Sequence, residues 1–280
     1  MTGTDQVVRY AVEDGFATLT LDSPHNRNAI SSALVTQLLE GFERAAGDVA
    51  VRGVVLTHTG NTFCAGADLK EAVDADPAAA ADIRTQWMVR LLRTVLELPK
   101  PVIARVDGHV RAGGMGVLAA CDIAVAGRGS SFALTEARLG LAPFVISLTL
   151  LPKLTARAAD RYFLTGEKFD AVTAERIGLV TVAADDPLTA TADVLTELRQ
   201  GSPQGLAESK RLTTAAMLAE FDRSADELAR RSGRFFDTPE VIEGMTAFLQ
   251  RRPPRWAAEP SAPAETTGSA GRATEPRSAE

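Results

Sequence analysis

The fold is decided by one stretch, Arg105–Leu141, which reads RVDGHVRAGGMGVLAACDIAVAGRGSSFALTEARLGL. It contains a glycine-rich turn at 112–114, a small-residue apolar run at 115–121 that predicts a helix, and Glu136 in an apolar, strand-like setting. Glycine lets the backbone approach a ligand closely, and the helix that follows points unpaired N–H groups and a positive dipole end towards it. These parts together predict an oxyanion hole, in which aimed N–H groups stabilise a negatively charged oxygen.

A second glycine-containing loop lies earlier in the chain, at 62–70, with the sequence TFCAGADLK. It follows an apolar strand expected at about 51–57 and precedes helix-like sequence, as the first loop does. With both loops in this order, separated by an amphipathic helix at about 78–98 and a strand at 101–106, the chain resembles the enoyl-CoA hydratase/isomerase family, the crotonases. The resemblance covers roughly residues 7 to 256. It implies that the N–H groups of Ala67 and Gly113 hold the thioester oxygen of an acyl-CoA.

Glu136 is the residue to which the resemblance assigns proton transfer, since it has the spacing of the second catalytic glutamate of family hydratases. Apolar neighbours at 132–134, 139 and 141 are expected to raise its pKa, and the alternative role is an ion pair with Arg138. The chain departs from the family pattern at Gly116, where standard hydratases carry their first glutamate. Three functions therefore stay open: a hydratase with a single glutamate, which we favour, an enoyl-CoA isomerase, or an acyl-CoA binder of low activity.

The resemblance also implies a set of residues that bind the CoA thioester. They are Arg27, Ala29, Ala65, Asp68, Leu69, Gly114, Phe248 and Arg251. Asp68 is expected to hold its loop rather than to react. The apolar residues of the helix at 78–98 are expected to be core, with Trp87 or Met88 as candidates for lining the acyl channel. Arg111 and Arg138 are candidates for binding a second carboxylate on the acyl chain, although surface charge is the account we favour for both. No separate cofactor is implied, because CoA is part of the substrate.

The composition limits the remaining classes of partner. A net charge of −6 over 280 residues argues against nucleic acid or an anionic membrane as a general partner. Three scattered histidines do not predict a metal site, and two cysteines do not predict a disulfide framework. Because the start of the sequence has no signal pattern and no apolar run reaches spanning length, we expect a cytoplasmic location.

The elements read along the chain predict an α/β protein in three parts. Residues 1–200 are expected to form a crotonase-like core of ββα units wound as a spiral, beginning with a hairpin at Asp14-Gly15. Residues 201–256 are expected to form a helical appendage, with helices at 204–220, 225–236 and 239–251, that assembles a homotrimer or a dimer of trimers. Residues 257–280 lack hydrophobic periodicity and are expected to be disordered. Acyl chain length, branching and a distal carboxylate stay open, although bulky residues at 142–147 favour a short or branched acyl group.

Overall fold

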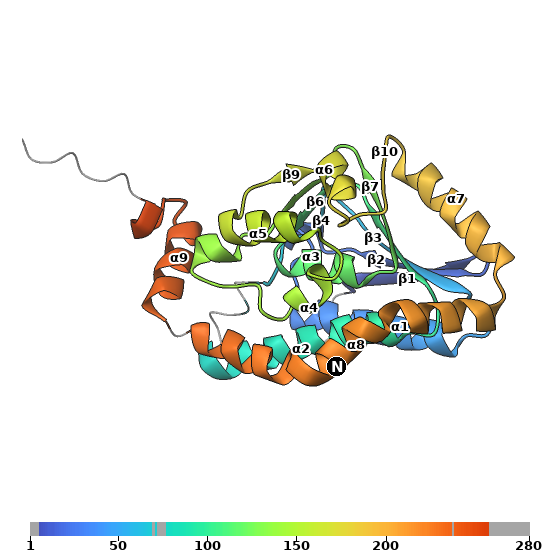
Figure 1. Ribbon diagram of the computed structural model, residues 1–280, viewed down its shortest axis with the longest axis horizontal. Helices are drawn as coiled ribbons and strands as arrows, with labels where there is room; N and C mark the ends of the chain where they lie inside the picture. The colour runs from blue at the N-terminus through green and yellow to red at the C-terminus, as the bar shows by residue number, and fades with distance from the viewer. Residues whose placement is uncertain (1–5, 69–70, 72–76, 237, 258–280) are drawn as a thin grey trace, which may run out of the picture.

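The computed structural model describes residues 6–68, 71, 77–236 and 238–257, and of the side chains at 77–82 nothing is described. The predicted disordered tail and Leu69 therefore lie outside the described residues. The described strands form two sheets (Figure 1). The larger sheet has the order β1 (Val8–Glu13), β2 (Phe16–Leu21), β3 (Gly53–His58), β5 (Val102–Val106), β7 (Ile123–Gly127) and β10 (Val182–Ala184). The smaller sheet has the order β4 (Thr62–Cys64), β6 (His109–Arg111), β8 (Ser131–Ala133) and β9 (Phe169–Asp170).

Helices connect the strands and continue beyond them. They are α1 (Ser32–Gly47), α2 (Pro77–Glu97), α3 (Gly113–Ala120), α4 (Ser147–Leu150), α5 (Ala156–Thr165), α6 (Ala171–Arg176), α7 (Pro187–Gln200), α8 (Pro203–Phe235) and α9 (Pro239–Leu249). Three short 3-10 helices are η1 (Pro24–Asn26), η2 (Glu136–Leu139) and η3 (Arg255–Ala257). None of the helices, as far as they are described, is long and apolar enough to cross a membrane.

The chain repeats one arrangement three times. Strands β3, β5 and β7 enter the large sheet, and the strand that follows each of them, β4, β6 or β8, enters the small sheet before the chain turns into helical structure. Parallel pairing joins β3, β5 and β7 to one another, and β4, β6 and β8 likewise. The predicted α/β fold built from stacked ββα units is thus confirmed.

The hairpin prediction is confirmed by the antiparallel register of β1 and β2, in which Glu13 faces Phe16. Asp14 and Gly15 both have positive φ, at 50° and 80°, which suits the twist of a two-residue hairpin. Both cysteines, Cys64 and Cys121, are free and buried.

The C-terminal helices differ from the expectation in one respect. The two helices predicted at 204–220 and 225–236 are a single helix, α8, of 33 residues. Phe221 and Ala225 are both buried and lie four residues apart, so the apolar face of the helix continues through the predicted gap. Figure 1 shows α8 running alongside α2 for much of its length.

The buried side chain of Lys210 links α8 to the core. The Lys210 ammonium group lies 2.8 Å from the Asp122 carboxylate and donates to the carbonyl oxygens of Val95 and Lys100. Asp122 also accepts the N–H of Val102, which begins β5. Desolvation lowers the pKa of Lys210, and the charge of Asp122 opposes this shift. Asp122 is therefore a structural residue that links the end of α3 to β5 and to the C-terminal region.

Candidate active site

Three segments of the candidate site leave the same edge of the small sheet. Strands β4, β6 and β8 are adjacent and parallel, so their carboxyl ends lie together. Ala67 comes three residues after β4, Gly113 two residues after β6, and Glu136 three residues after β8. Crevices at the carboxyl ends of parallel strands are where ligands bind in α/β proteins. The sheet itself therefore brings together the three residues predicted to act on the substrate.

The loop that carries Ala67 is fixed by a segment distant in sequence. Ala65 donates its N–H to the carbonyl of Arg27, while Ile30 donates to the carbonyl of Gly66 and accepts from Asp68. Ile30 is thereby paired with Ala67 as in a short parallel ladder. In such a ladder the flanking residues make the bonds, so the N–H of Ala67 points away from Ile30.

The second loop turns sharply just before α3. Ala112 has φ 48° and ψ −124°, a conformation that costs an L-residue about 1–3 kcal/mol and is retained where the surroundings impose it. Its N–H donates to the carbonyl of Ala133 at 3.0 Å, which links the ends of β6 and β8. A Cβ added to Gly66 would lie 2.9 Å from the Cβ of Ala112 and 3.8 Å from the nitrogen of Gly113, so the two loops are in contact.

The N–H groups of Ala67 and Gly113 donate to no acceptor among the described residues. Gly113 is the first residue of α3, so its N–H is one of the unpaired donors at the positive end of the helix dipole. A Cβ at Gly113 would meet Ile30 Cδ1 at 3.0 Å and Met88 Cε at 3.1 Å, which places these two side chains beside it. The arrangement can hold a negatively charged oxygen beside an apolar wall.

Glu136 is the carboxylate of the site. It begins η2 rather than continuing a strand, because β8 already ends at Ala133; the strand-like setting predicted from the sequence is wrong in this detail. Its Oε2 atom is buried and has no hydrogen-bond partner among the described residues. Burial raises the pKa of Glu136 from the ordinary 4.5 to about 7, against a smaller effect of its own backbone N–H. A carboxyl group of this pKa can exchange a proton near neutral pH.

Gly116 faces a side chain where the family hydratases carry a glutamate. A Cβ at Gly116 would lie 2.3 Å from Ile146 Cγ2 and 2.6 Å from Ile146 Cβ. Thr149, one turn further on, donates its hydroxyl to the carbonyl of Gly116 at 3.0 Å. The space beside Gly116 is thus filled by α4 and the residue before it. Sequence reasoning missed Ile146, since only the tertiary contact shows that it replaces the carboxylate.

The residues predicted to bind CoA fall into two groups around these loops. In the first, Arg27 has a left-handed backbone at φ 58° and a guanidinium that bonds to no described residue, while Ala29 is buried. Asp68 accepts from Asn26 Nδ2 at 3.0 Å and so holds its loop, as expected. Gly114 is buried against Cys64, and a Cβ added to Gly114 would lie 2.9 Å from the Cys64 Sγ atom. Gly114 therefore packs closely against β4 and leaves no room for a side chain.

The second group lies at the C-terminus. The helix α9 packs on η2, since a Cβ at Gly244 would meet the carbonyl of Leu139 at 2.4 Å. Phe248 follows one turn later and is 55 % exposed, and Arg251 has a positive φ of 55° just beyond the helix. Phe248 therefore lies on the helix that contacts the segment of Glu136, and Arg251 follows that helix directly.

The guanidinium groups of Arg111 and Arg138 donate hydrogen bonds to nearby residues. Arg111 donates to the carbonyl of Ser131 and to its hydroxyl, and Arg138 donates to the carbonyl of Thr165 at 2.9 Å. The alternative ion pair between Arg138 and Glu136 is absent from the part of the chain that the structure describes. Both arginines therefore serve local structure.

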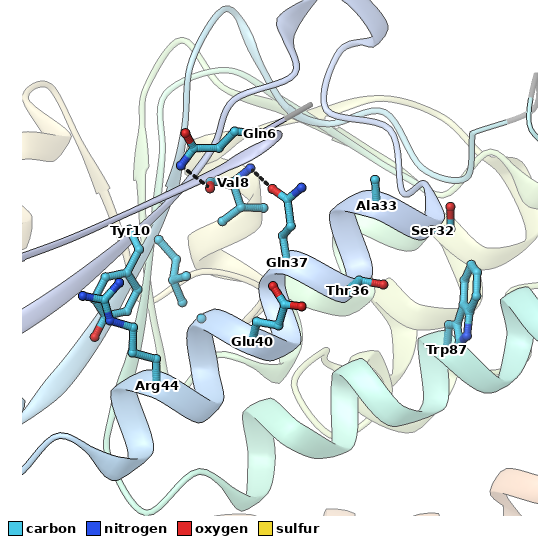
Figure 2. A pocket seen from close by; sticks show the side chains of 12 residues that line it. Gln6, Val8, Tyr10, Ser32, Ala33, Thr36, Gln37, Glu40, Arg44 and Trp87 are labelled. Carbon is cyan, nitrogen blue, oxygen red and sulfur yellow. Dashed lines mark hydrogen bonds between the residues drawn. The ribbon is translucent and has the colours of Figure 1, made fainter. Parts of the chain in front are cut away.

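A separate hollow lies away from these residues (Figure 2). Its volume is about 600 Å³, and it is bounded by β1, by α1 and by Trp87 of α2. Trp87 lines this hollow, but neither Glu136 nor Gly113 does. The neighbouring Met88 lies beside Gly113 instead. Across the described ranges no three His, Cys, Asp or Glu side chains are grouped to hold a metal ion.

Comparisons with known proteins point to one family. A family model described as enoyl-CoA hydratase/isomerase matches residues 11–259. A crystal structure of an enoyl-CoA hydratase from Mycobacterium avium is 57% identical, covers 90% of this chain and 100% of its own, and superimposes with a TM-score of 0.85. The 2,3-dehydroadipyl-CoA hydratase of Escherichia coli is 33% identical over 84% of this chain and 92% of its own length. The 1,2-epoxyphenylacetyl-CoA isomerase of Escherichia coli is 32% identical over 88% of this chain and 96% of its own length.

Proposed function

The chain belongs to the enoyl-CoA hydratase/isomerase family, and from this membership we propose that it adds water to the double bond of a 2-enoyl-CoA thioester. The observation that carries the proposal is the meeting of Ala67, Gly113 and Glu136 at one edge of the small sheet. The hydratase names of relatives such as the Mycobacterium avium enzyme support the same choice.

In the proposed reaction the thioester oxygen accepts the N–H groups of Ala67 and Gly113. Ionised Glu136 removes a proton from a water molecule as its oxygen bonds to C3, and the electrons of the C2–C3 double bond move to the thioester oxygen as an enolate. The two N–H groups stabilise this charge, each by about 3 kcal/mol on the scale known for oxyanion holes. Glu136 then returns the proton to C2, which completes the addition with one carboxylate.

Isomerisation of a 3-enoyl to a 2-enoyl thioester is the second candidate, and one contact favours it. Ile146 occupies the space beside Gly116, so the site has Glu136 but no second carboxylate at that position. One carboxylate suffices to move a proton between C2 and C4 through the same enolate. The description of the family as hydratase/isomerase is in keeping with this alternative.

The test follows water addition and double-bond migration separately. Thioesters of the 2-enoyl and 3-enoyl series of several lengths are incubated with the wild type, with Glu136→Gln and with Glu175→Gln, which changes an exposed carboxyl on α6. Wild type and Glu175→Gln should hydrate 2-enoyl thioesters, and Glu136→Gln should bind CoA thioesters without turnover. Migration without detectable hydration would replace the hydratase by the isomerase, and absence of both in the wild type would leave a binding protein.

We further propose that the chain acts in the cytoplasm as a homotrimer or as a dimer of trimers. Large apolar side chains on α9 and beside it support an assembly, since Ile242 is 58% and Phe248 55% exposed in the single chain. Sedimentation at micromolar concentration tests this, and a stable monomer would contradict it.

A further inference from the structure

One face of α2 continues from the oxyanion loops towards the end of α8. Met88 on this face has its methyl group beside Gly113, within 3.1 Å of the position of a Cβ there. Arg84 precedes Met88 by one helical turn, so the two side chains lie on the same face, about 6 Å apart along the axis. The guanidinium of Arg84 lies 5.6 Å from the ring centre of Phe236, just after α8.

The guanidinium of Arg84 is partly buried and has no hydrogen bond or ion pair to any residue that the structure describes. The nearby Glu71 carboxylate acts on Arg84 electrostatically and opposes the lowering of its pKa by burial, but its oxygens accept the N–H and the hydroxyl of Ser32, and no hydrogen bond joins it to the guanidinium. Arg93, further along the same helix, shows the usual arrangement, with Glu97 at 2.8 Å and Asp222 at 2.6 Å. Partial burial of five N–H donors without an acceptor is unfavourable, and a bidentate carboxylate is the ligand that best satisfies them.

We propose that Arg84 binds the terminal carboxylate of the acyl group, so that the preferred substrates are short 2-enoyl-CoA thioesters with a carboxylate at the far end of the chain. This inference rests on the proposed function in placing the thioester oxygen at Ala67 and Gly113. From there the acyl chain passes Met88, which supplies an apolar contact, and ends about one helical turn further on at Arg84. A few methylene groups span this distance, and Phe236 forms the wall behind the guanidinium.

Binding tests the inference without requiring turnover. The probes are hexanoyl-CoA and adipyl-CoA, which have six carbons each and differ in the terminal carboxylate. Affinities are measured by titration calorimetry for wild type, Arg84→Gln, Arg84→Lys and Arg90→Gln. Arg90 is exposed on the same helix, so its replacement removes the same charge and controls for general attraction to the CoA phosphates.

Wild type and Arg90→Gln should bind adipyl-CoA more tightly than hexanoyl-CoA, and Arg84→Gln should lose about 10- to 100-fold in affinity for adipyl-CoA alone. Arg84→Lys should recover part of that loss, because a point charge remains without the bidentate fork. Equal affinity of wild type for the two probes, or an equal loss for both in Arg84→Gln, would overturn the inference.

Kinetics separates this outcome from failure of the proposed function. If wild type hydrates 2-hexenoyl-CoA and its ω-carboxy counterpart equally well, the hydratase stands and the role of Arg84 is refuted. If neither is hydrated while adipyl-CoA still binds through Arg84, the carboxylate site stands and the hydratase is refuted.

Discussion

Replacing Glu136 by glutamine changes stability in a way that depends on pH and can be worked out from the structure. The folded state raises the pKa of this carboxyl from 4.5 to about 7, because burial disfavours its charged form. Between these two values the folded state binds more protons than the unfolded chain, so wild-type stability decreases as the pH rises through this window. Glutamine does not titrate, and the variant should escape this loss.

The size of the effect follows from the shift. A shift of about 2.5 units corresponds to about 3 kcal/mol at 1.36 kcal/mol per unit. Since relaxation of the folded state and penetration of water usually reduce the penalty of a buried charge, we expect about 1–2 kcal/mol. Glu136→Gln should therefore gain this amount relative to wild type between pH 4.5 and pH 8. Any constant cost of the amide in the pocket cancels in the comparison.

The assay is urea unfolding at pH 4.5, 6, 7 and 8, with equal protein concentrations because association would otherwise change the midpoint. Glu175→Gln is the matched control and should show no difference that depends on pH. The activity of wild type should fall about tenfold per unit below pH 7, since the base must be ionised. A stability difference between Glu136→Gln and wild type that stays constant from pH 4.5 to pH 8 would refute the reasoning about burial.

Three further changes test the remaining parts of the structure. Lys210→Met leaves the Asp122 carboxylate buried without its partner and should cost about 3–5 kcal/mol in urea unfolding, part of which Asp122→Asn should restore; an unchanged midpoint in the single variant would contradict the buried pair. Gly116→Glu should destabilise the fold by about 1–3 kcal/mol or more, because its Cβ would lie 2.3 Å from Ile146, whereas combining it with Ile146→Gly should fold and raise hydration relative to isomerisation. Wild-type stability of Gly116→Glu would show that Ile146 moves aside freely. Arg251→Ala should weaken CoA binding and flatten its salt dependence, and unchanged values would make Arg251 a surface residue.

Local sequence patterns were enough to predict several elements of the fold. The Asp14-Gly15 turn and the helix α2 were predictable because turn chemistry and helical periodicity act over a few residues. The prediction of two helices in place of α8 was wrong, because it too relied on local pattern alone. Asp222 and Ser224 are common at helix ends, yet the burial of Phe221 against the rest of the molecule keeps the helix continuous, and this is a tertiary effect.

The candidate site was predictable in its loops but not in its walls. Glycines near Ala67 and Gly113, together with Glu136, could be read from spacing, and the small sheet brings them together. No sequence pattern reveals that Ile146 fills the space beside Gly116, or that the guanidinium of Arg111 donates its hydrogen bonds to Ser131. Such contacts depend on how distant segments pack, which spacing along the chain does not encode.

The repeated strand pairs also bear on how new chemistry arises in this architecture. Each of the three units ends in its own loop and contributes one part of the candidate site, namely Ala67, Gly113 or Glu136. The hydrogen bonds that hold the strands in place belong to the backbone, so a side chain beyond the end of one strand can be exchanged while the other two loops keep their positions. Evolution can therefore alter the residue after one strand and retain the N–H groups in the other two loops, and an engineer has the same freedom, one loop at a time.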